Sequence, residues 1–132
     1  MNAVDTNVLI QYIVNDDAEQ FAKAEAFMKG RNSDDPAFIS LIVLVELTWV
    51  LRRLYRYSRE QVHAVLLLIV ETAGLLIEDE FFVSTLISRG AALKDELADH
   101  LIAHSALKAG CVRTVTFDRE AAARIPTMEL LS

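Results

Sequence analysis

The stretch Ala3-Val4-Asp5-Thr6-Asn7-Val8-Leu9 joins a short apolar strand, an acid and the start of a helix. We expect the strand to end at Asp5, and Thr6 and Asn7 to cap the helix that begins just after them. In an open parallel sheet, ligands gather outside the carboxyl ends of the strands. Asp5 is therefore a candidate functional residue, the alternative being an ordinary helix N-terminal acid favoured by the helix dipole.

The same alternation of short apolar segments and longer helical patterns continues along the chain. Further strands are expected at 37–39, 75–77 and 112–117, with a weak fifth at 130–131, and helices at 18–29, 41–56, 59–72, 82–89 and 96–108. Strands that alternate with helices predict βαβ units. The sequence therefore predicts an α/β fold with a central, mostly parallel sheet, in a single domain over residues 1–132.

Length, composition and net charge exclude several classes of protein. The chain has 132 residues, of which 53% are hydrophobic and 24% charged, and a formal net charge of −6. A lone cysteine, Cys111, excludes a disulfide framework. No apolar run approaches the roughly 18 residues of a membrane span, and the N-terminal residues lack a basic region, so we expect a reduced, cytoplasmic protein. The acidic balance argues against nucleic-acid binding by bulk charge but not against a nuclease that binds cations.

Four acids are expected to converge at one edge of the predicted sheet. Asp5 and Asp118 end predicted strands, whereas Glu46 and Asp99 lie in the first turns of predicted helices, with Glu96 one turn before Asp99. A carboxylate in the apolar stretch around Glu46 is costly unless it is paired or bound to a metal ion. Asp118 has an alternative role as the residue that ends a strand in a turn.

Clustered carboxylates repel one another and need a strong counter-charge to stay ionised. Mg²⁺ or Mn²⁺ meets this need through oxygen ligands, and such a site suits metal-assisted hydrolysis of phosphoesters. His100 and His104 have the i, i+4 spacing of a zinc pair on a helix, but no metalloprotease pattern accompanies them. We therefore expect these histidines to face solvent.

The densest group of basic residues follows the second predicted strand. It comprises Arg52, Arg53, Arg56 and Arg59, and Arg53 shares a helix face with Glu46. Arginines in this position could grip the phosphates that flank a scissile bond. The alternative is a solvated helix end whose cations favour the helix C-terminus.

Four segments, in this order, resemble the motifs of PIN-domain ribonucleases, particularly the VapC-type toxins of toxin–antitoxin modules. They are Val4-Asp5-Thr6-Asn7-Val8-Leu9, Ser40-Leu41-Ile42-Val43-Leu44-Val45-Glu46-Leu47, Glu96-Leu97-Ala98-Asp99-His100-Leu101-Ile102-Ala103 and Thr114-Val115-Thr116-Phe117-Asp118-Arg119. The resemblance covers essentially the whole chain. It implies a three-layer α/β/α fold and a divalent-metal-dependent endoribonuclease.

The resemblance also assigns roles to residues. The metal-site and catalytic residues would be Asp5, Glu46, Asp99 and Asp118, and the polar supports would be Thr6, Asn7 and Thr116. Many relatives carry an Asp three residues before the third acid, where this chain has Glu96. Such toxins form homodimers and are silenced by a cognate antitoxin protein. The alternatives are a PIN-like nuclease of RNA maturation or DNA processing, and a non-catalytic α/β binding module.

Overall fold

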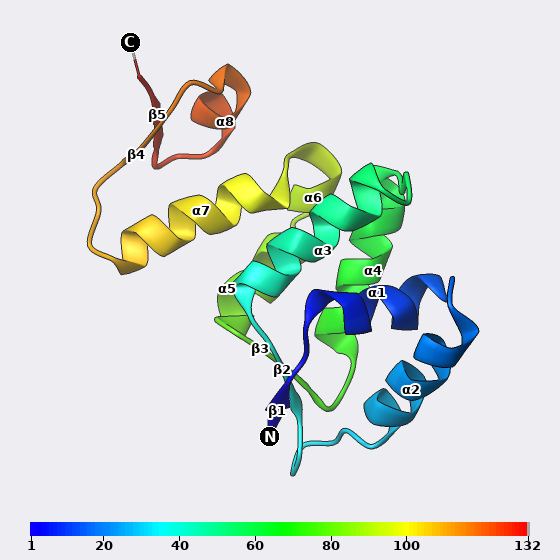
Figure 1. The fold of residues 1–132 in the computed structure, drawn as a ribbon. Helices are drawn as coiled ribbons and strands as arrows, with labels where there is room; N and C mark the ends of the chain where they lie inside the picture. Colours follow the sequence, from blue (N-terminus) through cyan, green and yellow to red (C-terminus); the bar gives the residue numbers. More distant parts are fainter. Residues whose placement is uncertain (132) are drawn as a thin grey trace. The chain divides into compact units, whose positions relative to one another are not determined.

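The computed structural model describes residues 1–131, and its internal contacts divide the chain into two compact units between Leu93 and Lys94 (Figure 1). The prediction of one domain over residues 1–132 stays a prediction. Among the described residues, no helix has the length and apolar character needed to cross a membrane.

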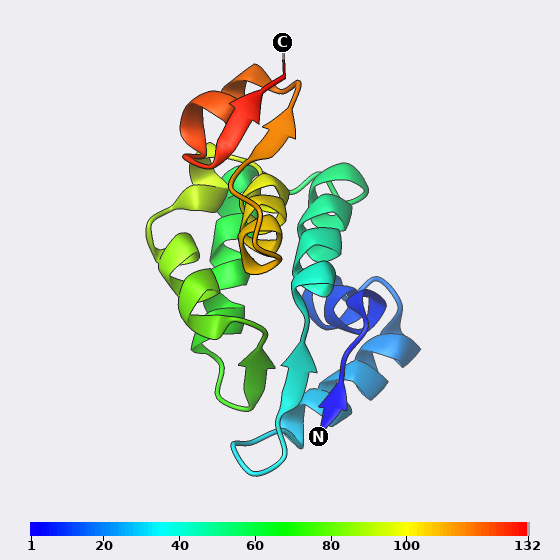
Figure 2. The ribbon, with the colours of Figure 1, turned by 90° about the vertical axis from the view of Figure 1, so that its left-hand side faces the viewer.

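The first unit is built on a three-stranded parallel sheet. Its strands are β1 (Asn2–Ala3), β2 (Ala37–Ile39) and β3 (Leu75–Ile77), hydrogen-bonded in the order β1-β2-β3. Figure 2 shows the three arrows side by side and pointing the same way, in blue, cyan and green. The second and third strands lie where the sequence predicts them.

Helical hairpins connect these strands. The helices of the first unit are α1 (Thr6–Val14), α2 (Ala18–Lys29), α3 (Leu41–Arg53), α4 (Arg59–Glu71) and α5 (Glu80–Ser88), and the short α6 (Ala91–Lys94) runs into the second unit. Polar caps fix where the helices begin: Asp17 accepts hydrogen bonds from two backbone N–H groups of α2, and Ser58 forms a capping box with Gln61 at the start of α4. Each connection between neighbouring strands is thus a pair of helices, and capping side chains determine where the helices begin.

The largest fully buried side chains all belong to the first unit. They are Leu9, Ile39, Leu44, Leu47, Leu51, Leu66, Ile87 and Val83. Three of them come from α3, which also buries Leu41 and so presents one continuous apolar stripe. The buried face of α3 therefore fixes the orientation of its other, exposed face.

The second unit consists of α7 (Leu97–Lys108), β4 (Thr114–Thr116), α8 (Arg119–Arg124) and β5 (Met128–Leu130). Its two strands pair in parallel and appear as adjacent orange and red arrows in Figure 2. Ala103 of α7, Ala121 and Ile125 at α8, and Met128 of β5 form its core cluster. Both sheets are parallel, which agrees with the predicted α/β class.

Some element boundaries differ from the predictions. The third helix ends at Arg53 instead of continuing to Arg56, because Arg56 adopts a left-handed backbone conformation with φ of 57°. The N-cap of α1 is Asp5, so the prediction that Thr6 and Asn7 cap this helix is wrong. Helices α6 and α8 were not predicted, since four and six residues are too few to show helical periodicity.

Gly74, in the turn before β3, is required by its surroundings. Its φ is +87°, and a Cβ atom there would lie 2.8 Å from the backbone carbonyl of Arg31. Ala37 N donates a 2.8 Å hydrogen bond to Gly74 O, so the turn is also tied to β2. The loop before β2 and the turn before β3 can approach each other this closely only without a side chain.

Gly74→Ala should lower the free energy of unfolding by about 3 kcal/mol, because it adds a backbone clash to the left-handed strain. Gly90→Ala is the matched control: its φ is +78°, but the added Cβ would make an ordinary 3.5 Å contact with Leu93 Cδ1. The control should lose only about 1 kcal/mol. Equal losses for both variants in urea denaturation would show that the close approach to Arg31 is unimportant.

Candidate functional site

The carboxyl edge of the first sheet carries one polar side chain per strand. Asp5 follows β1, Ser40 follows β2 and Glu78 follows β3. Extended past the strand ends, the pairing registers align Asp5 with Ser40 and Ser40 with Glu78. The parallel arrangement therefore brings these three residues to equivalent positions at one edge.

Asp5 has a defined orientation. Its Oδ1 accepts a 2.7 Å hydrogen bond from Thr6 N, which caps α1, while the residue as a whole stays exposed. Thr6 is 4% exposed, and its Oγ1 is buried without a hydrogen-bond partner among the described residues. Asn7 is exposed. Asp5 thus offers carboxylate oxygen to solvent from a fixed backbone position.

A groove of about 830 Å³ opens beside these residues in the first unit. Its walls come from β1, from α1 including Asn7 and Gln11, and from α2 including Lys23 and Phe27. Asp5 is one of the residues that line this groove, whose size is that of a small-ligand site.

Glu46 is exposed, and the expectation that its carboxylate lies among apolar side chains is wrong. The buried stripe of α3 passes through Leu44 and Leu47, and Glu46 lies on a different face. Arg53, seven residues further on, is exposed as well. Because Glu46 is exposed, its carboxylate does not need a counter-ion to stay ionised. Its prediction as a metal ligand therefore depends only on the motif that contains it.

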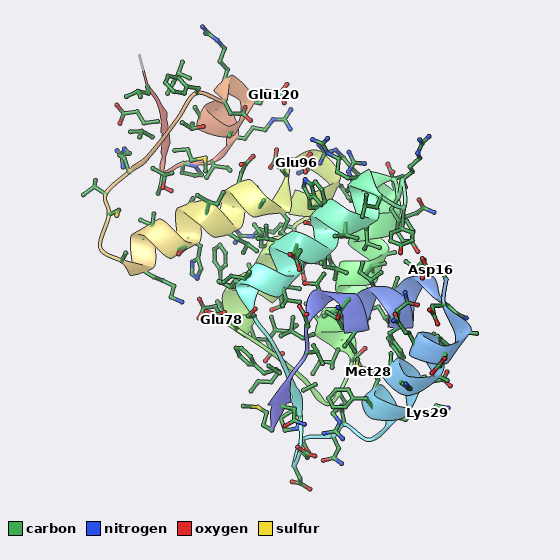
Figure 3. All side chains as sticks on the ribbon, in the orientation of Figure 1. Asp16, Met28, Lys29, Glu78, Glu96 and Glu120 are labelled. Atoms are coloured by element: carbon green, nitrogen blue, oxygen red, sulfur yellow. The ribbon has the colours of Figure 1, made fainter. Side chains whose placement is uncertain are left out.

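Glu78 was missed in the sequence. Its Oε1 accepts a 3.0 Å hydrogen bond from Leu41 N, and its own N–H donates to Ile39 O at 2.9 Å. Figure 3 shows Glu78 near the start of α3. The rule that singled out Asp5, an acid immediately after a strand, also applies to Glu78 and could have found it.

Two other acids of the second unit, Glu96 and Asp118, lie close enough to influence Asp99. Glu96 precedes α7 and Asp99 lies in its first turn, whereas Asp118 caps α8 by accepting a 3.0 Å hydrogen bond from Ala121 N. Partial burial, and then the negative charges of Asp118 and Glu96, raise the pKa of Asp99 above its ordinary value. Asp99 therefore lies within electrostatic reach of Asp118 and Glu96, and the predicted convergence of the four acids stays a prediction.

Thr116 supports this group through the backbone. Its Oγ1 accepts a 3.0 Å hydrogen bond from Asp118 N, at the point where β4 gives way to α8. The hydroxyl and the capping carboxylate together fix the chain at the carboxyl end of β4. The Thr116 hydroxyl thus holds the backbone of Asp118 and not its carboxylate, and the supporting role of Thr116 at a metal site stays a prediction.

Asp95 forms two side-chain hydrogen bonds that the sequence did not predict. Its Oδ2 lies 3.0 Å from His100 Nε2, and its Oδ1 accepts a 2.9 Å hydrogen bond from Arg124. Burial acts to raise the pKa of Asp95, but the hydrogen bonds from Arg124 and His100 outweigh it and hold the pKa below its ordinary value. His100 is 16% exposed, so the expectation that it faces solvent is wrong.

Among residues 1–131, no three His, Cys, Asp or Glu side chains form a group that could hold a metal ion. Two of the four predicted ligands, Asp5 and Glu46, belong to the first unit, and the other two, Asp99 and Asp118, belong to the second. All four supply carboxylate oxygen, the donor that Mg²⁺ and Mn²⁺ prefer. The donor chemistry fits these ions, and the complete ligand set stays a prediction.

The described fold and the acids at its strand ends can be compared with known families. The PIN domain family matches the chain over residues 3–126. The chain belongs to the PIN-domain family. Searches of curated proteins and of solved structures give no significant match.

Membership of the PIN-domain family confirms the predicted α/β fold class and the predicted resemblance at the level of the family. PIN domains are generally nucleases that use divalent metal ions and act on nucleic acids, so the match indicates a metal-dependent nuclease. The matched residues include the positions of all four predicted acidic ligands.

Asp99→Asn should raise the melting temperature of the metal-free protein at neutral pH. Because the folded-state pKa of Asp99 lies above its ordinary value, folding becomes less favourable as the pH rises through the unfolded-state pKa and then the folded-state pKa. The stabilisation should therefore vanish in strong acid and grow toward neutrality. Asp34→Asn, which removes the same charge from an exposed loop, is the control and should change little. A lower melting temperature for Asp99→Asn at neutral pH would contradict repulsion by Asp118 and Glu96.

Proposed function

We propose that this PIN domain is a divalent-metal-dependent endoribonuclease. The observation that carries the proposal is the family match over residues 3–126, with an acid at each of the four predicted ligand positions. Asp5, Glu46, Asp99 and Asp118 would hold Mg²⁺ or Mn²⁺. When bound, the ion supplies a more acidic water and charge stabilisation for phosphodiester hydrolysis.

Electrostatics within the second unit support a cation there. Asp99 and Asp118 repel each other, and Glu96 adds a third negative charge. A divalent cation would relieve this repulsion and keep the carboxylates ionised at neutral pH. Glu96 is exposed and precedes α7, so its longer side chain suits an outer position around the ion.

The remaining polar residues would support the ligands. Thr6 donates its backbone N–H to Asp5, and Thr116 fixes the backbone of Asp118. Asn7 is exposed one helical position further on, beside the groove along β1. A hydrogen bond to a ligand carboxylate or to the backbone that carries it fixes the ligand for a metal ion, so Thr6 and Thr116 would act on the proposed site through Asp5 and Asp118.

Arginines at the end of α3 would contact the phosphates of the RNA. Arg53 and Arg56 are exposed, and the left-handed conformation of Arg56 turns the chain directly after the helix. Arg52 is half-buried and donates a 3.3 Å hydrogen bond to Tyr57 O, which ties it to the same turn. We therefore assign phosphate contacts chiefly to Arg53 and Arg56, with Arg52 stabilising the turn that carries them.

Purified protein should cleave single-stranded RNA in Mg²⁺ or Mn²⁺, and a chelator should stop the reaction. Asp5→Asn should lower the cleavage rate by more than about 100-fold, a larger loss than outer-shell partners typically cause. Its fold should persist, because Asn caps helices as well as Asp does. The measurement is the cleavage rate of labelled RNA, with the melting temperature recorded for each variant.

Asp17→Asn is the matched control for that experiment. Asp17 caps α2 through hydrogen bonds from Glu19 N and Gln20 N, so the substitution changes the same kind of helix cap away from the predicted ligands. It should cleave RNA at the parent rate. Cleavage in excess chelator, or equal rates for Asp5→Asn and Asp17→Asn, would refute the proposed metal site. Preferential cleavage of DNA would favour the alternative nuclease role.

We further propose that the nuclease acts in the cytoplasm as a VapC-type toxin, forms a homodimer and is silenced by a cognate antitoxin. The ordered motifs around Asp5, Glu46, Asp99 and Asp118 support this role through their resemblance to such toxins. Induced expression should arrest bacterial growth, and Asp5→Asn should abolish the arrest. Co-expression of the adjacent reading frame should relieve it. Normal growth at a high level of the folded wild-type protein would contradict the toxin role.

A further inference from the structure

Asp95 joins the start of α7 to the end of α8. Its side chain is 16% exposed, and each of its carboxylate oxygens has a partner: His100 Nε2 at 3.0 Å from Oδ2, and Arg124 at 2.9 Å from Oδ1. Arg124 also donates a 2.7 Å hydrogen bond to Lys94 O. One guanidinium group thus holds two consecutive residues, Lys94 and Asp95, in the segment just before α7.

The two partners of Asp95, His100 and Arg124, belong to the same elements as Asp99 and Asp118. His100 follows Asp99 directly in the first turn of α7, and Arg124 is the last residue of α8, whose N-cap is Asp118. Since α8 has six residues, fixing its last residue constrains its first. The contacts of Asp95 therefore restrain both elements that carry the like-charged carboxylates.

We propose that Asp95 is a positioning residue, which holds α7 and α8 so that Asp99 and Asp118 present their carboxylates together to a divalent cation. This inference rests on the proposed function, because that function makes Asp99 and Asp118 metal ligands. Repulsion alone would drive these two side chains apart in the metal-free protein. Charge-assisted hydrogen bonds from Arg124 and His100 to Asp95 oppose that separation.

Asp95 is distinct from the ligands that it positions. Both of its oxygens accept hydrogen bonds, and the Arg124 guanidinium already supplies a counter-charge, so Asp95 does not need a metal ion to stay ionised. Its low pKa keeps it ionised at neutral pH, which the pairing with Arg124 requires. Partners of this kind outside the ligand set affect metal affinity through the geometry of the ligands.

The test measures Mn²⁺ binding to the full chain by electron paramagnetic resonance, separately from RNA cleavage. Asp95→Asn should weaken Mn²⁺ binding by about 10- to 100-fold and lower kcat for RNA while KM for RNA is unchanged. Arg124→Gln should act in the same direction. Because Arg124 is 51% exposed, this second variant keeps the test valid if Asp95→Asn fails to fold. In the double variant the losses should be less than additive.

Asp16→Asn is the matched control. Asp16 also accepts two side-chain hydrogen bonds, from Tyr55 Oη at 2.7 Å and from Gln11 Nε2 at 2.6 Å, but it lies at the α1–α2 turn of the first unit (Figure 3). A comparable loss of stability without a change in Mn²⁺ affinity is expected. Hydrogen exchange of the metal-free protein should be faster at the start of α7 for Asp95→Asn and Arg124→Gln, but not for Asp16→Asn.

The outcomes separate this inference from the proposed function. If the wild-type protein binds Mn²⁺ and cleaves RNA, and both folded variants keep the parent affinity, then Asp95 does not position the ligands and the proposed function stands. If the wild-type protein neither binds Mn²⁺ nor cleaves RNA, both are overturned. If Asp16→Asn weakens Mn²⁺ binding as much as Asp95→Asn does, the effect is general destabilisation and the positioning role is refuted.

Discussion

The second unit must accommodate a partly buried carboxylate, Asp99, close to other negative charges. Asp99 and Asp118 come from elements separated in the sequence, and partial burial of Asp99, followed by the negative charge of Asp118, raises the pKa of Asp99. A fold keeps such a pair only when other contacts hold the surrounding backbone, and here Thr116 and Asp95 provide them.

The residues of the proposed site also determine local structure. Asp5 caps α1 and Asp118 caps α8, while Glu78 accepts a hydrogen bond from the first residue of α3. A carboxylate that accepts backbone N–H groups has a fixed orientation before any ligand arrives. Capping therefore fixes the orientation of these carboxylates before a ligand binds. Because Asn also caps helices, an Asp→Asn change can remove the charge and leave the cap in place.

Much of the fold could be predicted because apolar periodicity decides it. β2, β3 and α2 lie where short apolar runs and a capped helical pattern place them. Glu46 shows how such reasoning fails at a single position: the surrounding residues are apolar, but only one face of α3 is buried. The helical phase, rather than the local composition, determines the environment of a side chain.

Contacts between distant residues are the part that the sequence could not supply. The pairing of Asp95 with Arg124 spans 29 positions, and it depends on α8, a helix too short to show in the pattern. His100 was judged by its spacing from His104, whereas its environment is set by Asp95, which precedes the helix. Acids at strand ends follow from the topology and can be predicted from the sequence. The hydrogen bonds between distant residues that orient them appear only in the folded structure. The proposed metal ligands therefore follow from motif and topology, whereas the contacts of Asp95 and Thr116 follow from the folded structure.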